Sequence, residues 1–434
     1  MTYGIKRTHL ASEITPELDG SQVTLLGWLH EKRDLGGLRF LVIRDRSGLV
    51  QAIAAKKEVS RELWDEISSF KRESVLAVKG IAKASPQAPG GAEVRIREVT
   101  LISPSEDPPI DVVGKTNADL DTRLDNRIVD LRRTEPQAIF RIQSTVSSAI
   151  RSYLRENGFI EIFTPKIIAT ATEGGASLFS VFYYDRIAYL SQSPQLYKEQ
   201  LTSAFERVFE IAPAFRAEES DTQRHLSEIT MVDAEAAFMD YQDIMSLLDG
   251  LVERVVKTVN KENQKELKVL GREEVEVKLP IPRITYDEAV SVLERKGVEH
   301  EKDADFGTVQ LKALSEELSD FYFITDWPTA ARPFYAKPLE GRPERCESFD
   351  LMYGWIELAS GATRINDGKL LKERMSSQGL NPDSFKTHLK WFNYGMPPHA
   401  GFGLGLARLL MVLTGKDNIR EVVMFPRDKR RLEP

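Results

Sequence analysis

Residues 215–228 of the chain read Phe-Arg-Ala-Glu-Glu-Ser-Asp-Thr-Gln-Arg-His-Leu-Ser-Glu. This segment is polar and charged, and strand-like runs at 207–212 and 229–238 lie on either side of it. Two other segments stand out: 158–165 reads Gly-Phe-Ile-Glu-Ile-Phe-Thr-Pro, and 401–408 reads Gly-Phe-Gly-Leu-Gly-Leu-Ala-Arg. A Gly-x-Gly-x-Gly run alone usually marks a turn, so the three segments are informative only in combination.

The part of the chain that carries these segments has a mixed α and β pattern. Apolar residues at helical spacing predict a helix that begins near Thr134 and ends at Gly158, and strands are expected at 321–325 and 348–358. A glycine-rich turn and an apolar helix are expected over 401–413. Since the strands mostly follow one another with helices outside them, we predict an α+β fold with an antiparallel sheet flanked by helices.

The first hundred residues show a different pattern, with a short helix capped by Ser60. Five strand-like runs are predicted there, at 23–28, 40–44, 49–54, 75–82 and 94–102. Five strands with one helix favour a small closed β-barrel, and the OB-fold is its most common form. The stretch 103–131 begins with a proline-rich run and is predicted to be a linker.

The composition is that of a globular protein, with 41% hydrophobic and 29% charged residues. The single cysteine, Cys346, excludes an intrachain disulfide and is expected to be a free thiol. No apolar run approaches the ~20 residues that span a bilayer, and the N-terminus lacks the apolar stretch of a signal peptide, so a cytoplasmic location is expected. The net charge is −7, yet residues 1–100 hold 16 basic and 13 acidic residues, which weakly favours contact of this part with a polyanion.

In their order and spacing, the three segments resemble motifs 1, 2 and 3 of the class II aminoacyl-tRNA synthetases. The resemblance covers essentially the whole chain and is strongest to the archaeal-type aspartyl-tRNA synthetases, within the subgroup that loads aspartate, asparagine and lysine. It implies an OB-fold anticodon-binding domain at 1–102, a linker or hinge at 103–131 and a class II catalytic domain at 132–434. The activity implied is ATP-dependent activation of L-aspartate to aspartyl-adenylate and its transfer to tRNA.

The chemistry of activation explains why arginines are expected. An amino-acid carboxylate must approach the negatively charged α-phosphate of ATP, so positioning and fixed positive charge supply most of the catalysis. The resemblance makes Arg216 and Arg408 the catalytic residues, with Arg216 bridging carboxylate and phosphate as a planar guanidinium can. The ATP-binding residues that the resemblance implies are Arg216, Glu218, Arg224, His225, Leu226, Glu357, Gly405 and Arg408.

The resemblance also implies a magnesium ion and shows two departures from the family pattern. Glu357 and Ser360 would hold Mg²⁺ through oxygen atoms, which a hard cation prefers. Ala407 stands where an acidic residue is common, and Ile229 stands where an aromatic side chain often stacks on adenine. These departures concern how adenine is bound and leave the expected reaction unchanged.

Residues 191–198, Ser-Gln-Ser-Pro-Gln-Leu-Tyr-Lys, are similar to the aspartate-pocket motif of the aspartyl enzymes. Ser193 and Pro194 are predicted to be the N-cap and first residue of a helix. Gln195 and Lys198 would then lie three residues apart on one face of that helix.

A pocket for aspartate must neutralise the side-chain carboxylate, because an unpaired buried charge is costly. Lys198 and Arg364 provide two cations for this purpose. The loop 171–175 would close over the substrate. The aspartate-binding residues implied by the resemblance are Glu173, Gln195, Lys198, Arg216, Asp233, Ser360 and Arg364.

The family reads the tRNA anticodon with its N-terminal barrel. The resemblance implies that Phe40 stacks on a base and that Gln51 reads the middle uridine, with Arg33 nearby, as in recognition of single strands. The alternative for Phe40 is a place in the barrel core. His30 and Pro89 stand where enzymes restricted to tRNA(Asp) tend to have tryptophan and lysine, so charging of both tRNA(Asp) and tRNA(Asn) is expected.

Other functions remain open from the sequence alone. The chain could be an aspartyl-tRNA synthetase restricted to tRNA(Asp), an asparaginyl-tRNA synthetase or asparagine synthetase relative, or a non-catalytic OB-fold nucleic-acid-binding paralogue. Lys198 and the anticodon-type barrel count against the asparagine enzymes. The presence of Arg216, Glu357, Arg364 and Arg408 counts against a non-catalytic paralogue.

The expected partners follow from the same resemblance. They are L-aspartate, ATP, tRNA(Asp) and tRNA(Asn), and no membrane partner is expected. Motif 1 usually lies at a dimer interface, so Pro165 and its strand imply a homodimer. Aspartate placed on tRNA(Asn) would require an Asp-tRNA(Asn) amidotransferase, so a functional link to such an enzyme is expected.

Overall fold

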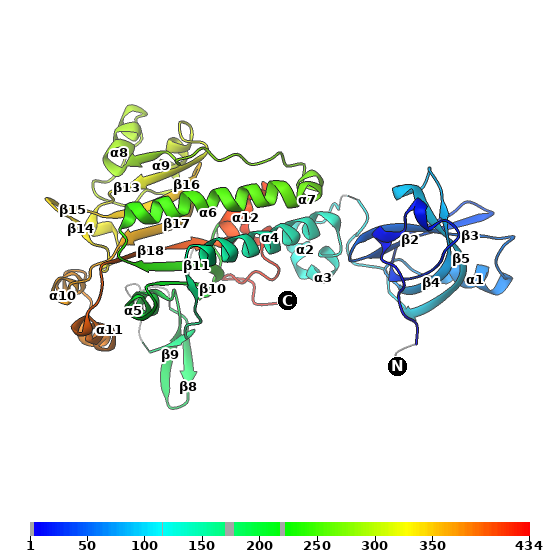
Figure 1. The fold of residues 1–434 in the computed structure, drawn as a ribbon, viewed down its shortest axis with the longest axis horizontal. Helices are drawn as coiled ribbons and strands as arrows, with labels where there is room; N and C mark the ends of the chain where they lie inside the picture. The colour runs from blue at the N-terminus through cyan, green and yellow to red at the C-terminus, as the bar shows by residue number, and fades with distance from the viewer. Residues whose placement is uncertain (1–3, 115, 170–177, 218–221) are drawn as a thin grey trace. The chain divides into compact units, whose positions relative to one another are not determined.

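The computed structural model describes residues 4–114, 116–169, 178–217 and 222–434 (Figure 1). The chain divides into two compact units, Met1–Arg133 and Thr134–Pro434. The first unit contains a β-barrel with short helices, and the second contains a large sheet with helices packed against it.

The barrel of the first unit is closed by five strands in the order β1-β2-β3-β5-β4, which confirms the predicted OB-fold barrel. The strands are β1 (Gln22–Asp34), β2 (Leu38–Asp45), β3 (Gly48–Ala55), β4 (Val75–Ala84) and β5 (Ala92–Ser103). Alternate side chains point into the barrel, for example Leu41 and Ile43 of β2 and Val50 and Ala52 of β3. This alternation leaves the other side chains of each strand for the outer surface.

Short helices complete the first unit. Helix α1 (Arg61–Ser69) begins after Ser60, whose hydroxyl oxygen accepts a hydrogen bond from the Leu63 N–H, as the predicted N-cap should. The stretch predicted as a linker contains α2 (Leu120–Asp125) and α3 (Arg127–Asp130), so it is partly helical.

The second unit is built on an eight-stranded sheet in the order β12-β13-β16-β17-β18-β11-β10-β6. Its strands are β6 (Ile160–Glu161), β10 (Arg207–Phe215), β11 (Glu228–Ala237), β12 (Arg283–Thr285), β13 (Phe321–Thr325), β16 (Ser348–Tyr353), β17 (Ile356–Thr363) and β18 (His399–Gly405). Neighbours are antiparallel except at the two edges, where β6 runs parallel to β10 and β12 runs parallel to β13. The predicted antiparallel sheet is confirmed, with a parallel strand added at each edge.

Helices α4 (Thr134–Glu156), α6 (Tyr241–Glu262) and α12 (Leu406–Thr414) pack against one another or against the sheet (Figure 1). The apolar stripe that predicted α4 is buried, including Ile142, Val146 and Leu154. The helix ends just before Gly158, as predicted.

Two predictions about strands were wrong. Residues 348–358 were expected to form one strand but belong to the hairpin β16–β17, because Gly354 turns the chain with a φ of 52°. Residues 399–405 include the predicted glycine-rich turn but form β18, between β17 and β11. Glycine is usually unfavourable inside a strand unless another group must approach the backbone closely. Gly401 is such a case, because neighbouring groups leave no room for a side chain there.

Because position 401 requires glycine, a single added methyl group is expected to destabilise the protein. A Cβ on Gly401 would overlap the Glu235 carboxylate and the Ala234 carbonyl oxygen. The substitution Gly401→Ala is therefore expected to lower the free energy of unfolding by about 1–3 kcal/mol, measured by thermal or denaturant unfolding. At the control position Gly405 a Cβ would lie 3.8 Å from the Arg408 side chain. Equal stability of G401A and G405A would contradict the close-approach explanation.

The remaining elements of the second unit surround the sheet. A three-stranded sheet has the order β7-β9-β8, with β7 (Ile167–Ile168), β8 (Ser180–Tyr183) and β9 (Arg186–Leu190), and β14 (Pro338–Leu339) pairs with β15 (Arg342–Cys346). The other helices are α5 (Gln195–Phe205), α7 (Gln264–Val269), α8 (Tyr286–Arg295), α9 (Thr308–Ser315), α10 (Gly368–Ser377) and α11 (Lys386–Trp391). Within the described ranges, no helix is long and apolar enough to cross a membrane.

Cys346 is a buried free thiol, as predicted. Its sulfur lies 3.4 Å from the Trp327 carbonyl oxygen and 3.1 Å from the Ser348 hydroxyl. Burial raises the pKa of the thiol, which keeps it protonated and unreactive.

Candidate functional site

A cavity of about 260 Å³ lies in the second unit, with walls from α5, β11, β17, β18 and α12. It brings together all of the described residues that the sequence indicated for ATP and aspartate. They are Gln195, Lys198, Arg216, Arg224, His225, Leu226, Asp233, Glu357, Ser360, Arg364, Gly405 and Arg408. The other two candidates, Glu173 and Glu218, and the loop 171–175 lie outside the described residues.

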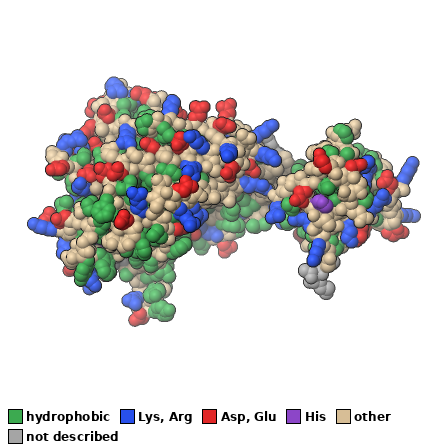
Figure 2. Space-filling view, in the orientation of Figure 1, with side chains coloured by type: hydrophobic (Ala, Val, Ile, Leu, Met, Phe, Trp, Pro, Cys, Tyr) green, Lys and Arg blue, Asp and Glu red, His purple; other side chains and the backbone are tan. Residues whose placement is uncertain are grey.

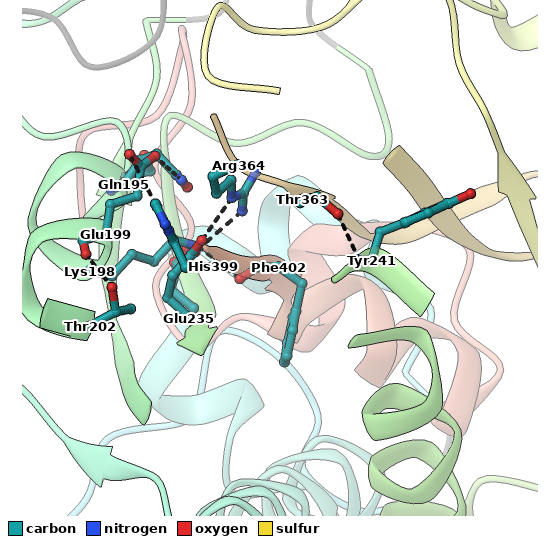
Figure 3. A network of polar contacts seen from close by, with 12 residues as sticks. Gln195, Lys198, Glu199, Thr202, Glu235, Tyr241, Thr363, Arg364, His399 and Phe402 are labelled. Carbon is teal, nitrogen blue, oxygen red and sulfur yellow. Dashed lines mark hydrogen bonds and ion pairs between the residues drawn. The ribbon is translucent and has the colours of Figure 1, made fainter. Parts of the chain in front are cut away.

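Lys198 is the most deeply buried cation of the cavity, with 2% of its surface exposed. Its ammonium nitrogen donates hydrogen bonds to Asp233 Oδ1 and to the Phe402 carbonyl oxygen, both at 2.9 Å. A second carboxylate, that of Glu235, lies 3.4 Å away. The ammonium group is therefore fixed in place by β11 and β18 before any substrate binds (Figure 3).

Arg364 follows β17 and forms a buried ion pair with the same Glu235. Its Nε lies 2.8 Å from Oε1 and one terminal nitrogen lies 3.3 Å from Oε2 (Figure 3). Burial opposes the charge on Arg364, but the Glu235 carboxylate outweighs it and raises the pKa of the guanidinium. Glu235 thus pairs with both Lys198 and Arg364 beside one pocket.

Glu235 was missed by sequence reasoning, although a signal for it was present. Asp233 and Glu235 are two residues apart on one strand, so their side chains leave the same face of the sheet. Two acidic residues on one face of an otherwise apolar strand indicate charge partners nearby. The pattern could have identified Glu235 as the partner of the two cations.

Helix α5 begins one residue later than predicted. Pro194 is the N-cap, and Gln195 is the first helical residue. The Ser193 hydroxyl oxygen still accepts a hydrogen bond from the Gln195 N–H at 3.3 Å. Gln195 and Lys198 both line the cavity, as expected for positions three apart on a helix.

Arg224 extends the cavity toward the hairpin β16–β17. Its guanidinium carbon lies 4.0 Å from the centre of the Trp355 ring, and its terminal nitrogens donate to the Trp355 carbonyl oxygen and the Thr308 hydroxyl. Burial lowers the pKa of Arg224, and the nearby charge of Arg408 lowers it further. Two arginines held this close form a site suited to a polyanion.

Arg408 donates a hydrogen bond to the carbonyl oxygen of Glu357 at 2.9 Å, and its guanidinium lies 3.5 Å from the Glu357 carboxylate. Ile229 and Ala407, the two departures from the family pattern, also line the cavity. An aliphatic side chain at position 229 can contact a planar base by van der Waals packing alone.

The residues around Glu357 fit a hard divalent cation. Asp350 lies directly across from Ser360 between β16 and β17, and its Oδ1 is buried with no hydrogen-bond partner among the described residues. Burial raises the pKa of Asp350 to about 7, although Arg332 opposes this effect. Oxygen atoms from Glu357, Ser360 and Asp350 match the ligands that Mg²⁺ takes in proteins, with its remaining ligands from phosphates and water. Asp350 is a second residue that sequence reasoning missed.

Arg33, Phe40 and Gln51 lie on the outer surface of the barrel, on three neighbouring strands. Arg33 pairs with Phe40 across β1 and β2, and Gln51 lies two positions along β3 from the residue opposite Phe40. Phe40 is half-buried and neighbours the core residue Leu41, so it points away from the barrel core. Gln51 donates to Glu93 at 3.1 Å. A phenyl ring, an amide and a guanidinium thus share one face.

His30 and Pro89 have different surroundings within the first unit. The His30 ring is 7% exposed and its Nδ1 lies 3.1 Å from Arg44, which forms a buried ion pair with Glu73. Pro89 is exposed in the turn between β4 and β5. A larger side chain at position 30 would have to displace this buried pair.

Comparison with known proteins supports the same assignment of both units. Residues 119–429 match the family described as tRNA synthetases class II (D, K and N), and residues 23–102 match the OB-fold nucleic acid binding domain. The chain is 51% identical over 430 residues to the Aspartate--tRNA(Asp/Asn) ligase of Sulfurisphaera tokodaii, covering 99% of this chain and 100% of that protein. It is 49% identical to the ligase of the same name from Saccharolobus solfataricus, with the same coverage.

Solved structures of this class have the same fold. The asparaginyl-tRNA synthetase of Pyrococcus horikoshii with asparaginyl-adenylate has a TM-score of 0.95 and 36% identity over 99% of this chain and 100% of that chain. The aspartyl-tRNA synthetase of Entamoeba histolytica has a TM-score of 0.88 and 32% identity over 100% of this chain and 94% of that chain. The chain therefore belongs to the class II tRNA synthetase family (D, K and N), and within it to the group of the archaeal aspartate--tRNA(Asp/Asn) ligases.

Proposed function

We propose that the chain activates L-aspartate with ATP and attaches it to tRNA(Asp) and also to tRNA(Asn). The observation that carries the proposal is the pair of buried cations, Lys198 and Arg364, in the same cavity as Arg216, Arg224 and Arg408. The two buried cations suit the side-chain carboxylate of aspartate, and the three arginines suit the phosphates of ATP.

The amino-acid site binds aspartate by exchange of ion-pair partners. The α-ammonium group of aspartate takes Asp233 as its partner, while the side-chain carboxylate binds Lys198 and Arg364 in the cavity. Glu235 pairs with both cations and holds them in position beside the pocket. Asparagine, which brings no negative charge to these two cations, binds more weakly.

Activation joins the substrate carboxylate to ATP beside Arg216. A carboxylate oxygen of aspartate bonds to the α-phosphorus, and the bond from that phosphorus to the leaving diphosphate breaks. Arg216 contacts both anions and stabilises the charge that builds on the α-phosphate. A Mg²⁺ ion held by Glu357, Ser360 and Asp350 would orient the phosphates and neutralise part of their charge. A ribose hydroxyl at the 3′ end of tRNA then attacks the acyl carbon, loses its proton, and AMP leaves.

The proposal of two tRNA substrates is supported by the names of the relatives and by His30 and Pro89. The archaeal relatives at about half identity are named for both tRNAs. If the chain charges tRNA(Asn) with aspartate, an Asp-tRNA(Asn) amidotransferase must complete the asparaginyl-tRNA.

Aminoacylation with radiolabelled aspartate, on tRNA(Asp) and tRNA(Asn) transcripts side by side, tests the function. Charging of both is expected, with radiolabelled asparagine giving no product. Charging of tRNA(Asp) alone would keep the aspartate activity and remove the role proposed for His30 and Pro89. Charging with asparagine and not with aspartate would overturn the proposal. Chelation of Mg²⁺ is expected to stop both reactions.

A substitution on the outer face of the barrel is expected to weaken tRNA binding and to leave the activation of aspartate unchanged. Stacking of one base on an aromatic side chain contributes about 1–3 kcal/mol, so Phe40→Ala is expected to raise the KM for tRNA by at least ~5-fold. ATP–diphosphate exchange, which needs no tRNA, provides the internal control and should be unchanged. Phe70 lies in the barrel core, so Phe70→Ala shows the effect of stability loss alone.

We further propose that two copies of the chain form a dimer through the region that contains motif 1. Large apolar side chains are exposed there and on the small sheet β7-β9-β8, where hydrophobic side chains gather in Figure 2. They are Ile160, Phe163, Ile167, Phe182, Tyr184 and Ile187. Light scattering gives the mass in solution, and a monomer at assay concentration would contradict the dimer.

A further inference from the structure

A carboxylate that no substrate can reach lies directly behind the aspartate pocket. Glu199 is fully buried on α5, one helical turn after Gln195 (Figure 3). Its neighbours are Gln195 on the pocket side and His388 and His399 on the other. A buried carboxylate with this set of partners must act through one of them, because its own oxygens do not line the cavity.

The contact between Glu199 and Gln195 determines which end of the Gln195 amide faces the substrate. Gln195 Nε2 donates a hydrogen bond to Glu199 Oε1 at 2.6 Å. An ionised carboxylate can only accept hydrogen bonds, so the amide nitrogen must face it. The carbonyl oxygen of Gln195 is then the end that remains for the cavity, where it can accept a hydrogen bond from an ammonium group.

His388 lies beside the second oxygen of Glu199. Its Nδ1 lies 2.9 Å from the amide nitrogen of Gln200, which can only donate, so Nδ1 accepts. The proton of a neutral His388 ring is therefore on Nε2, which lies 3.4 Å from Glu199 Oε2.

His399 faces the same oxygen and supplies the balancing charge. Its Nδ1 lies 2.8 Å from the Pro397 carbonyl oxygen, which can only accept, so Nδ1 carries a proton. A neutral ring would then turn the lone pair of Nε2 toward Glu199 Oε2, 3.8 Å away, and protonation removes this repulsion. Burial lowers the pKa of His399, but Glu199 and the more distant Glu235 raise it by more.

We propose that Glu199, held ionised by His388 and His399, is a positioning residue that fixes the Gln195 amide with its carbonyl oxygen toward the α-ammonium group of aspartate. This inference rests on the proposed function and adds a specificity element to it. The charged groups that face this set are Lys198 on α5, Glu235 on β11 and Arg364 after β17. With Asp233, the other partner of Lys198, these groups are two cations and two carboxylates. Their charges balance, so the Glu199–His399 pair leaves the pocket without excess negative charge.

The test is Glu199→Gln in the full-length enzyme. A carboxamide at position 199 can face Gln195 with either end, so the amide of Gln195 loses its fixed orientation. The KM for aspartate in ATP–diphosphate exchange is expected to rise about 10-fold, since a hydrogen bond to a charged group is lost. The KM for ATP should stay within about 2-fold. Thr202→Val is the matched control, because Thr202 is buried on the same helix and donates only to the Glu199 backbone.

Two further measurements separate positioning from a structural role. In wild type the KM for aspartate should rise as the pH passes above the pKa of His399, because Glu199 then becomes an uncompensated anion behind an anion-binding pocket. E199Q should lack this rise. In a Gln195→Leu background, E199Q should have no additional effect on the KM, whereas a structural role would add to it.

These experiments distinguish failure of this inference from failure of the proposed function. Wild type that does not activate aspartate would overturn the function itself. Wild type that activates aspartate, with E199Q at the same KM and the same pH profile, would overturn this inference alone. If E199Q does not fold, Glu199→Asp keeps the charge but withdraws the acceptor by one methylene group. The same rise in the KM for aspartate is expected for E199D, and an unchanged KM would overturn the inference.

Discussion

Replacement of Arg216 by glutamine is expected to slow ATP–diphosphate exchange with aspartate by about 10²–10³-fold, the usual effect of removing one preorganised donor to a transition state. Arg216 lies at the end of β10, where its backbone N–H is bonded to the Ser227 carbonyl oxygen at 2.9 Å. Its side chain lines the same cavity as the groups proposed for aspartate and those proposed for ATP. Without the guanidinium, the aspartate carboxylate and the α-phosphate of ATP must approach each other with no positive charge to bridge them.

Two comparisons test whether the effect belongs to the role of Arg216 in the transition state: that of kcat with the KM for aspartate, and that with a control arginine outside the cavity. Because Arg216 is proposed to stabilise the transition state, kcat should fall more than the KM for aspartate rises. Arg207, at the other end of β10, donates to the Asn157 carbonyl oxygen outside the cavity, so Arg207→Gln should leave kcat within about 2-fold. Arg216→Lys should recover only part of the rate, since an ammonium group lacks the planar two-point geometry. An R216Q enzyme with wild-type kcat would exclude the proposed role.

Replacement of Lys198 by methionine is expected to raise the KM for aspartate at least ~100-fold and to lower the free energy of unfolding by about 3–5 kcal/mol. Both effects have one cause. Lys198 is buried and shared between Asp233 and Glu235, so its removal leaves two carboxylates with one cation, Arg364. The pocket then repels the side-chain carboxylate of the substrate.

A second ion-paired lysine separates the binding effect from the loss of stability. Lys166 forms a salt bridge with the buried Glu210 at 2.8 Å, away from the cavity. Lys166→Met should destabilise the enzyme but leave the KM for aspartate unchanged. Thermal unfolding and ATP–diphosphate exchange on both variants supply the comparison. A K198M enzyme that keeps the wild-type KM would refute the assignment of Lys198 to the aspartate pocket.

The architecture could be predicted from the sequence because its signals are local. Ser60 marked the start of α1, and the alternation of apolar residues marked the five barrel strands. The helical stripe of α4 was equally clear. The order of strands in the large sheet could not be predicted, because β18 pairs with β11 and β17, which are distant along the chain. The glycines of β18 concealed a strand, since the close approach that requires glycine at position 401 comes from Ala234 and Glu235 on the neighbouring strand β11.

The candidate site was predicted to the extent that its residues line the cavity. Resemblance supplied the residues that line the cavity, and the structure places the described ones around a single space. Glu199, Glu235 and Asp350 were not predicted, although each is buried beside a cation or a protonatable ring. The spacing of Asp233 and Glu235 on β11 did carry a signal for Glu235. The partners of Glu199 and Asp350 come from elements that are distant along the chain, so no spacing in the sequence reveals these two residues.

The burial of Cys346 has a practical consequence for biophysical work on the enzyme. Cys346 is the single cysteine of the chain and its side chain is inaccessible, so maleimide reagents have no reactive native target. A cysteine introduced at an exposed position in the turn after β3, such as Lys57, would therefore accept one fluorophore or spin label per chain. Anticodon binding could then be followed by fluorescence or electron paramagnetic resonance in an otherwise native protein.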